Sequence, residues 1–425
     1  AIRAIGNSAV AALTTAQVGA LTASQVRALS TTEVAALTTG QVKALTATQV
    51  AALTEAQVGE LTTAQVNALS ATQITSMTTA DVAKLSGTQL KALTASSVAA
   101  LSTAQIKALT TAQADQLTAA QVGSLTASQI AGLDTEDLAK FTSEQIQSLN
   151  AKTVAALSTA QIQALTTAQV DKLTATQVKS LTTAQVSVLT ADQLAGLTTT
   201  QISKLTETQV GTLTSTQIKT IETADLQLMT AAQLQAITTT AAKALTVDQV
   251  TALTSVQISK LTEAQVAVLS AAQVQAITTT AVQQLTNSQV QALTTTAVKG
   301  MLTEQISKLT ATQLSNMTTS QVAVLTADQI VSFTTDQISK LTAEQMGAMT
   351  TSQIKSIATD DLQKLTAAQI QGITTDGVKA LLAEQVTAFT TAQISKLTEA
   401  QVGVLSVQQA QALATDDLPN LTNAQ

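Results

Sequence analysis

A strict eight-residue period runs through the sequence and limits what the chain can fold into. Stepping by eight from Leu13 to Leu421 lands on Leu, Ile, Met or Phe at all 52 positions, with no insertion or deletion. One such octad is residues 37–44, and we number its positions 0 to 7 from the Leu-type residue. Repeats of this kind stack on their neighbours into one array. We therefore expect a single continuous array over residues 1–425, with about 52 repeats and no linker.

A typical octad contains a complete signal for the start of a helix. Position 1 is Ser or Thr in 45 of 52 octads, and position 4 is Gln in 40 of 52. This is a capping box, in which the hydroxyl accepts from the N3 amide and the Gln side chain accepts from the N-cap amide. The apolar residues at positions 0 and 5 then form a hydrophobic staple. Representative capping residues are Thr38, Gln41, Thr62 and Gln65.

The charged residues support the same interpretation. Of 27 acidic residues, 24 lie at positions 1 to 4, and of 21 basic residues, 20 lie at positions 6 or 7. A helix dipole favours acids in the first turn and bases in the last turn. The pattern therefore predicts one very short helix in each octad.

Two other folds compete with short helices. In one continuous helix, an eight-residue repeat advances about 800°, so successive Leu positions drift by about 80° and no face stays apolar. A β-solenoid is the stronger alternative, because Thr, Val and Ile favour strands. However, positions 0 and 5 would then point to opposite faces of a strand. We expect an all-α solenoid with one helix per octad, and the β-solenoid stays open as the alternative.

Such short helices need stacking for stability, because isolated short helices are marginal in water. We expect Leu and Val inside a superhelix, and Thr, Gln, Lys and Glu outside. The number of octads per turn and the hand of the superhelix do not follow from the sequence. Representative core residues are Leu37, Val42, Leu45, Leu61, Val66 and Leu205.

The amino-acid composition argues against a catalytic or metal-binding site. His, Cys, Trp and Tyr are all absent, so the usual metal ligands, nucleophiles and general bases are missing. We expect no enzyme activity and no cofactor. The only weak candidate for a metal site is the cluster Asp134, Glu136 and Asp137, which is also explained as an N-cap with first-turn acids. A net charge of −6 and isolated Lys residues argue against nucleic-acid binding, and no apolar run is long enough to span a membrane.

The octads also resemble those of known proteins. Residues 61–66, Leu-Thr-Thr-Ala-Gln-Val, are similar to the repeats of very large bacterial proteins often labelled haem-utilisation or adhesion-like surface proteins. The resemblance implies secretion and a role at the cell surface or in a matrix. The sequence contains no His or Cys that could serve as an axial ligand of haem, so it does not support the haem label.

These observations favour a structural role. The first and last octads keep their apolar positions, whereas solenoids that end normally carry polar terminal repeats. We therefore expect copies to associate head to tail or laterally, as an extracellular or cell-surface filament, stalk or surface matrix. One alternative is an adhesin or binding scaffold with a cell-surface or matrix partner. A second alternative is an ice- or crystal-surface binder that uses its regular Thr residues.

Overall fold

The computed structural model describes residues 5–425, and this part of the chain is all-helical. It contains 51 short α-helices, one 3-10 helix η1 (Leu418–Asn420) and, within residues 5–425, no strand. The predicted all-α array with one very short helix per octad is confirmed. The β-solenoid alternative is wrong, because the capping signals in most octads outweigh the strand preference of Thr, Val and Ile.

The helices follow one rule along the chain. Helix αn begins at residue 8n − 1, so that α1 (Asn7–Ala12) is followed eight residues later by α2 (Thr15–Gly19). Most helices have six residues, as in α5 (Thr39–Ala44) and α8 (Thr63–Ala68). The five-residue helices are α2, α6, α7, α13, α15, α21, α23, α24, α25, α33, α39, α40, α41, α42, α44 and α51. The four-residue helices are α14, α26, α35, α45, α49 and α50.

A capping box starts most of the helices, and the Leu-type residue is the C-cap of the six-residue helices. At α5, the main-chain N–H of Gln41 donates to Thr38 Oγ1 at 3.2 Å, and Gln41 Oε1 accepts from the Thr38 N–H at 2.7 Å. Leu45 after the helix is extended, with φ −59° and ψ 134°. Its extended backbone directs the chain into the next capping residue, so a new helix begins in every octad.

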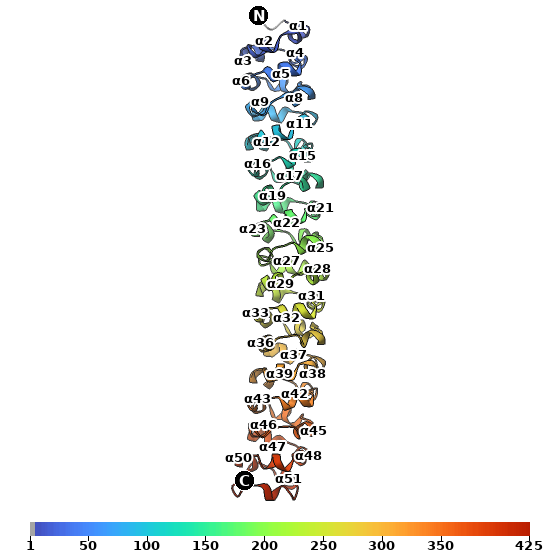
Figure 1. Ribbon diagram of the computed structural model, residues 1–425, viewed down its shortest axis with the longest axis vertical. Coiled ribbons are helices and arrows are strands. Elements are labelled where there is room, and N and C mark those ends of the chain that lie inside the picture. The colour runs from blue at the N-terminus through green and yellow to red at the C-terminus, as the bar shows by residue number, and fades with distance from the viewer. Residues whose placement is uncertain (1–4) are drawn as a thin grey trace. The chain divides into compact units, whose positions relative to one another are not determined.

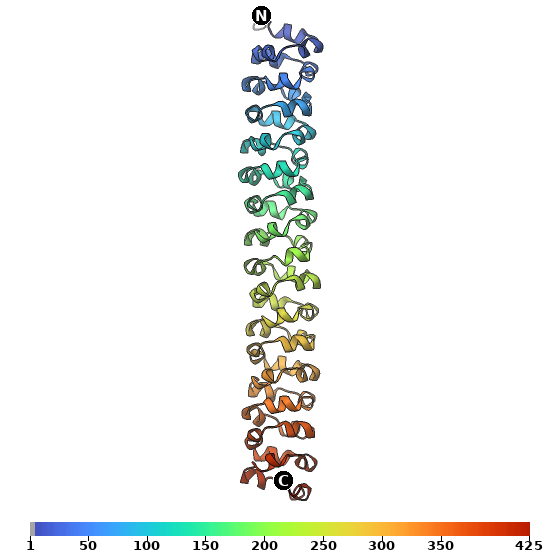
Figure 2. The same cartoon turned by 90° about the vertical axis from the view of Figure 1, so that its left-hand side faces the viewer.

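The chain forms two compact units, one ending at Thr212 and one spanning Leu213–Gln425. In each unit a helix packs against the third helix before it and the third after it, as α5 does against α2 and α8. Figures 1 and 2 show these helices as successive turns of a superhelix within each unit. The single array without a linker, expected over residues 1–425, stays a prediction.

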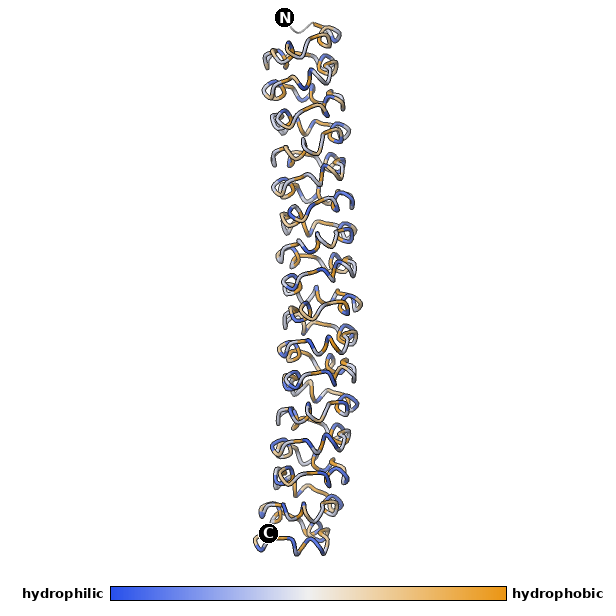
Figure 3. Tube along the Cα trace, viewed as in Figure 1, coloured by the Kyte–Doolittle hydropathy of each residue, from blue (hydrophilic) through white to orange (hydrophobic). Residues whose placement is uncertain are grey.

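The core lies inside the turns, and one part of its composition was not predicted. Positions 0 and 5 are buried throughout most of both units, and Figure 3 shows the resulting alternation of apolar and polar residues along the trace. Thr38 and Lys43 are exposed, as expected. The expectation that Gln lies outside is wrong at position 4, where Gln41 and Gln65 are each only 2% exposed. The predicted core residues are all buried: Leu37, Val42, Leu45, Leu61, Val66 and Leu205.

Candidate functional site

The most distinctive site in the fold is built by the buried glutamine at position 4. Gln65 lies in the first turn of α8, where its Oε1 accepts from the Thr62 N–H at 2.8 Å. Its own main-chain N–H donates to Thr62 Oγ1 at 3.2 Å. These two bonds form the predicted capping box, and they use the oxygen of the Gln65 amide but not its nitrogen.

The amide nitrogen of the same glutamine reaches the preceding turn. Gln65 Nε2 donates to the main-chain oxygens of Val34 at 2.9 Å and Leu37 at 2.7 Å. These oxygens lie at the end of α4 (Thr31–Ala36), where helix carbonyls otherwise lack partners. One neutral amide therefore caps the N-terminus of its own helix and also hydrogen-bonds to carbonyl oxygens at the C-terminus of a helix four octads earlier.

This link recurs in both units, and we call it the glutamine ladder. Its members are the position-4 glutamines whose Nε2 donates to main-chain oxygens 28 and 31 residues earlier, such as Gln41 to Leu13 and Val10. In the second unit, Gln321 donates to Leu293 at 2.7 Å and Val290 at 2.8 Å. A link across 28 residues spans three and a half octads. One superhelical turn therefore takes between three and four octads, a quantity that the sequence left undetermined.

Sequence reasoning found the capping half of this glutamine and missed the linking half. A signal was present, because Glu serves a capping box as well as Gln does, yet Glu33 is the only Glu at position 4. The Ser30 N–H donates to Glu33 Oε2 at 2.8 Å, and this bond holds the pKa of Glu33 below its ordinary value. A carboxylate accepts hydrogen bonds but cannot donate one to a carbonyl. The preference for Gln over Glu thus indicates a second, accepting partner.

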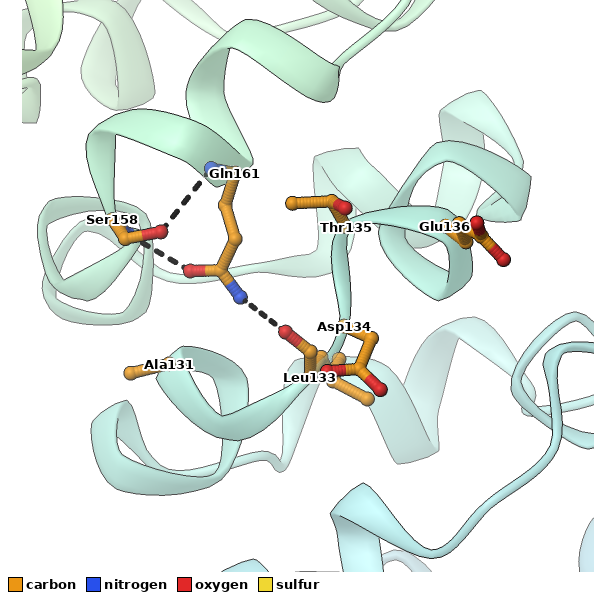
Figure 4. Close-up of a pocket in the computed structure, with 7 residues that line it drawn as sticks. All are labelled: Ala131, Leu133, Asp134, Thr135, Glu136, Ser158 and Gln161. Atoms are coloured by element: carbon orange, nitrogen blue, oxygen red, sulfur yellow. Dashed lines mark hydrogen bonds between the residues drawn. The ribbon is translucent and has the colours of Figure 1, made fainter.

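The acidic cluster proposed as a weak metal candidate lies beside a surface hollow. The hollow is lined by Ala131, Leu133, Asp134, Thr135, Glu136, Ser158 and Gln161 (Figure 4). Gln161 there makes the ordinary ladder bond to Leu133 at 2.8 Å, while Asp134 and Glu136 point in different directions. Within residues 5–425, no three His, Cys, Asp or Glu side chains form a group that could hold a metal ion. Asp134 stands at the N-cap of α17 (Thr135–Lys140), but its carboxylate makes no capping bond.

Asp137 is the third member of the cluster, and it occupies the ladder position itself. Its side chain is 3% exposed. Burial raises the pKa of Asp137, the side chain of Thr111 lowers it, and the nearby charges of Asp134 and Glu136 raise it further. The aspartate therefore fills a ladder position without an amide that could donate.

Comparison with known protein families agrees with the repeat found in the structure. The ALTTAQ repeat matches residues 2–31, 24–63, 76–111, 97–127, 130–167, 138–175, 153–183, 218–255 and 354–391, which together cover more than half of the chain. The chain belongs to the ALTTAQ repeat family. Residues 12–17 spell the ALTTAQ motif itself, and the final letter is the position-4 glutamine. In an ALTTAQ repeat protein of this fold, the motif thus ends on the residue that builds the ladder.

The comparisons show a repeat protein, and membership of a repeat family suggests a structural or scaffold role. The description of the ALTTAQ repeat names neither haem utilisation nor adhesion. No curated protein matches the chain. None of the helices in residues 5–425 is long and apolar enough to cross a membrane.

Proposed function

We propose that this ALTTAQ repeat protein is a structural protein that forms or extends a filament, stalk or surface matrix outside the cell. The glutamine ladder is the observation that supports this role most directly. The same buried link repeats within each unit, and it uses only groups of the chain itself. An array held in this way grows by adding octads, and each added octad brings its own core residues, cap and link.

The contact between turns also supplies a surface for self-association. One side of a turn presents position-4 amides, and the other side presents main-chain oxygens at positions 0 and 5. Two copies offer each other these same groups, so a head-to-tail contact repeats the contact within the chain. Head-to-tail contacts that do not close into a ring produce open filaments. We propose a second copy as the partner on this basis.

We also propose that the protein is not an enzyme. The hydroxyl groups at position 1 and the amides at position 4 are engaged in caps and in the ladder, as at Thr62 and Gln65. The polar side chains that remain exposed are Thr, Ser, Gln, Lys, Asp and Glu spread over the surface. Such groups, without a convergent acid, base or nucleophile, do not make a catalytic site.

Sedimentation velocity at increasing protein concentration, together with electron microscopy of the same samples, tests the proposal. We expect the wild-type chain to form longer assemblies as its concentration rises. In a sample of residues 1–425, Gln17 and Gln25 lie fewer than 28 residues from the first residue, so we expect their amides to donate to a second copy. The double variant Gln17→Glu with Gln25→Glu should keep both capping boxes and associate at least about tenfold more weakly, because carboxylates cannot donate.

A matched control carries the same change of charge at another place. Gln283→Glu with Gln291→Glu alters two exposed glutamines outside the ladder and should associate like the wild type. A wild-type chain that stays monomeric at every concentration would contradict the self-association. If both double variants weaken association equally, general charge repulsion and not the ladder contact is responsible.

A further inference from the structure

The glutamine ladder is interrupted in a regular way. Position 4 is not Gln in 12 octads, and ten of these form five pairs whose members are 16 residues apart, with one Gln octad between them. The pairs are Asp81 and Ser97, Asp137 and Thr153, Asp225 and Ala241, Ala281 and Ala297, and Asp361 and Gly377. The second pair begins 56 residues after the first, and the fourth pair begins 56 residues after the third. This distance is twice the 28 residues that a ladder bond spans.

The structure shows that each gap removes a link between turns. In the first unit, Gln89 Nε2 donates to the Leu61 oxygen at 2.7 Å. The main-chain oxygens of Leu53 and Leu69, which lie 28 residues before Asp81 and Ser97, receive no side-chain hydrogen bond from the described residues. The ladder bonds to these two oxygens are therefore lost, while Ser124 Oγ makes a separate bond between turns to the Ala95 oxygen at 2.9 Å.

The second unit contains the same arrangement with alanines. Gln289 Nε2 donates to the Leu261 oxygen at 2.7 Å, while no side chain in the described part of the chain donates to Leu253 or Leu269. Thr278 and Thr294 still cap the N–H groups of Ala281 and Ala297 at 3.2 and 3.1 Å. At these octads the helix start is kept and the ladder bond is lost.

Two gaps close together remove more ladder bonds between successive turns than a single gap does. A turn contains between three and four octads, so two gaps on either side of one Gln remove about half of its links. Between Gln273 and Gln305, Gln289 is the only ladder glutamine, and one exposed bond, from Gln275 Nε2 to the Gly300 oxygen at 2.6 Å, is added beside it. The apolar contacts continue, since Val282 and Val298 are fully buried. Apolar packing has no direction, whereas hydrogen bonds hold one turn in register over another.

We propose that the paired gaps are joints at which successive turns of the superhelix open or shift, so that the array bends or extends at defined places. This inference depends on the fold and goes beyond the structural role proposed above. The long Gln-linked stretches between the joints act as stiff segments. One such stretch runs from Gln305 to Gln353, where position 4 is Gln in every octad.

Hydrogen exchange of the full-length chain, followed by mass spectrometry, tests the joints. In the wild type, we expect buried amides of residues 250–300 to exchange about tenfold faster than those of residues 313–350, because local opening follows the local density of contacts. Ala281→Gln with Ala297→Gln should restore the missing links and slow this exchange to the rate of the Gln-linked stretch. Uniform exchange along both stretches in the wild type would overturn the proposal.

The double variant Ala281→Glu with Ala297→Glu separates the joint from the cap. Glu completes a capping box in this fold, as Glu33 does, but it cannot donate to the Leu253 and Leu269 oxygens. We expect the Glu variant to keep the fast exchange. Slow exchange in both the Gln and the Glu variants would mean that helix capping controls the opening, and the joint would be rejected. Asp81→Gln with Ser97→Gln repeats the test in the first unit, should the alanine variants fail to fold.

Discussion

At the scale of the residue, the position-4 glutamine does two tasks that no ionised side chain can combine. Gln321→Glu keeps a capping box but directs a carboxylate at the oxygens of Val290 and Leu293. We expect a loss of about 1–3 kcal/mol in the free energy of local opening at pH 7, because two buried carbonyls lose their donor. Hydrogen exchange of the surrounding octads, corrected for intrinsic rates, measures this free energy.

The pH dependence of the same variant checks the cause. Repulsion by the carbonyls should raise the pKa of the new carboxyl group above the ordinary value of about 4.3. The folded state then binds the proton more tightly, so stability is full below pH 4.3 or so and is lost as the pH rises through the raised pKa. Gln321→Ala should lose stability equally at every pH. A Gln321→Glu chain as stable as wild type at pH 7 would show that the amide donor is unimportant.

The capping residues were predictable from the sequence, and the ladder bond was not. Thr62 and Gln65 are three residues apart, so local rules are enough to pair them. Leu37 is 28 residues before Gln65, and that distance depends on how far each octad rotates the chain. Local rules do not give this rotation, because it results from how the extended residue after each helix and the core side chains pack together.

At the scale of the element, α38 (Thr303–Lys308) lacks a residue that can cap it. Leu302 occupies its N-cap position, offers no acceptor and is 48% exposed. Leu302→Thr should stabilise this helix by about 1 kcal/mol, which is typical for a restored N-cap. Leu302→Val has nearly the same shape as the Thr variant and no acceptor. Thermal unfolding of the two variants should therefore place Leu302→Thr above Leu302→Val, and equal melting temperatures would contradict the capping effect.

The stability of helix α17 should depend on pH because of Asp137. Burial raises the pKa of this residue, so its protonated form is favoured when α17 is folded. The stability of this region is then highest below the ordinary Asp pKa of about 3.9 and falls as the pH rises through the raised value. Asp137→Asn should remove this dependence and stabilise the region at neutral pH. Hydrogen exchange of residues 134–141 between pH 4 and pH 7 is the measurement, and exposed Asp328→Asn is the control expected to change little.

At the scale of the molecule, the eight-residue period, the capping box and the charge pattern together predicted an all-α array of stacked short helices. The eight positions of the octad recur without insertion, so successive octads form the same local structure. The size of the turn was not predictable, because it is set by contacts between octads. The buried location of Gln was missed for the same reason, since a side chain used only as a cap can remain at the surface.

Deletions in the chain test the fixed spacing of 28 residues between the two partners of a ladder bond. Removing residues 317–324 takes out one octad, and Gln329 then lies 28 residues after Leu293 in place of Met301. Both are position-0 residues, so the bond should re-form and the helical circular dichroism per residue should not change. Removing only residues 317–320 places Gln329 28 residues after Ala297, a position-4 residue, whereas ladder bonds end at the oxygens of positions 0, 5 and 6. Limited proteolysis should then cut near the shorter deletion and leave the octad deletion intact, because only a multiple of eight preserves the register between turns. Equal resistance of the two chains would contradict the requirement for a deletion of a multiple of eight residues.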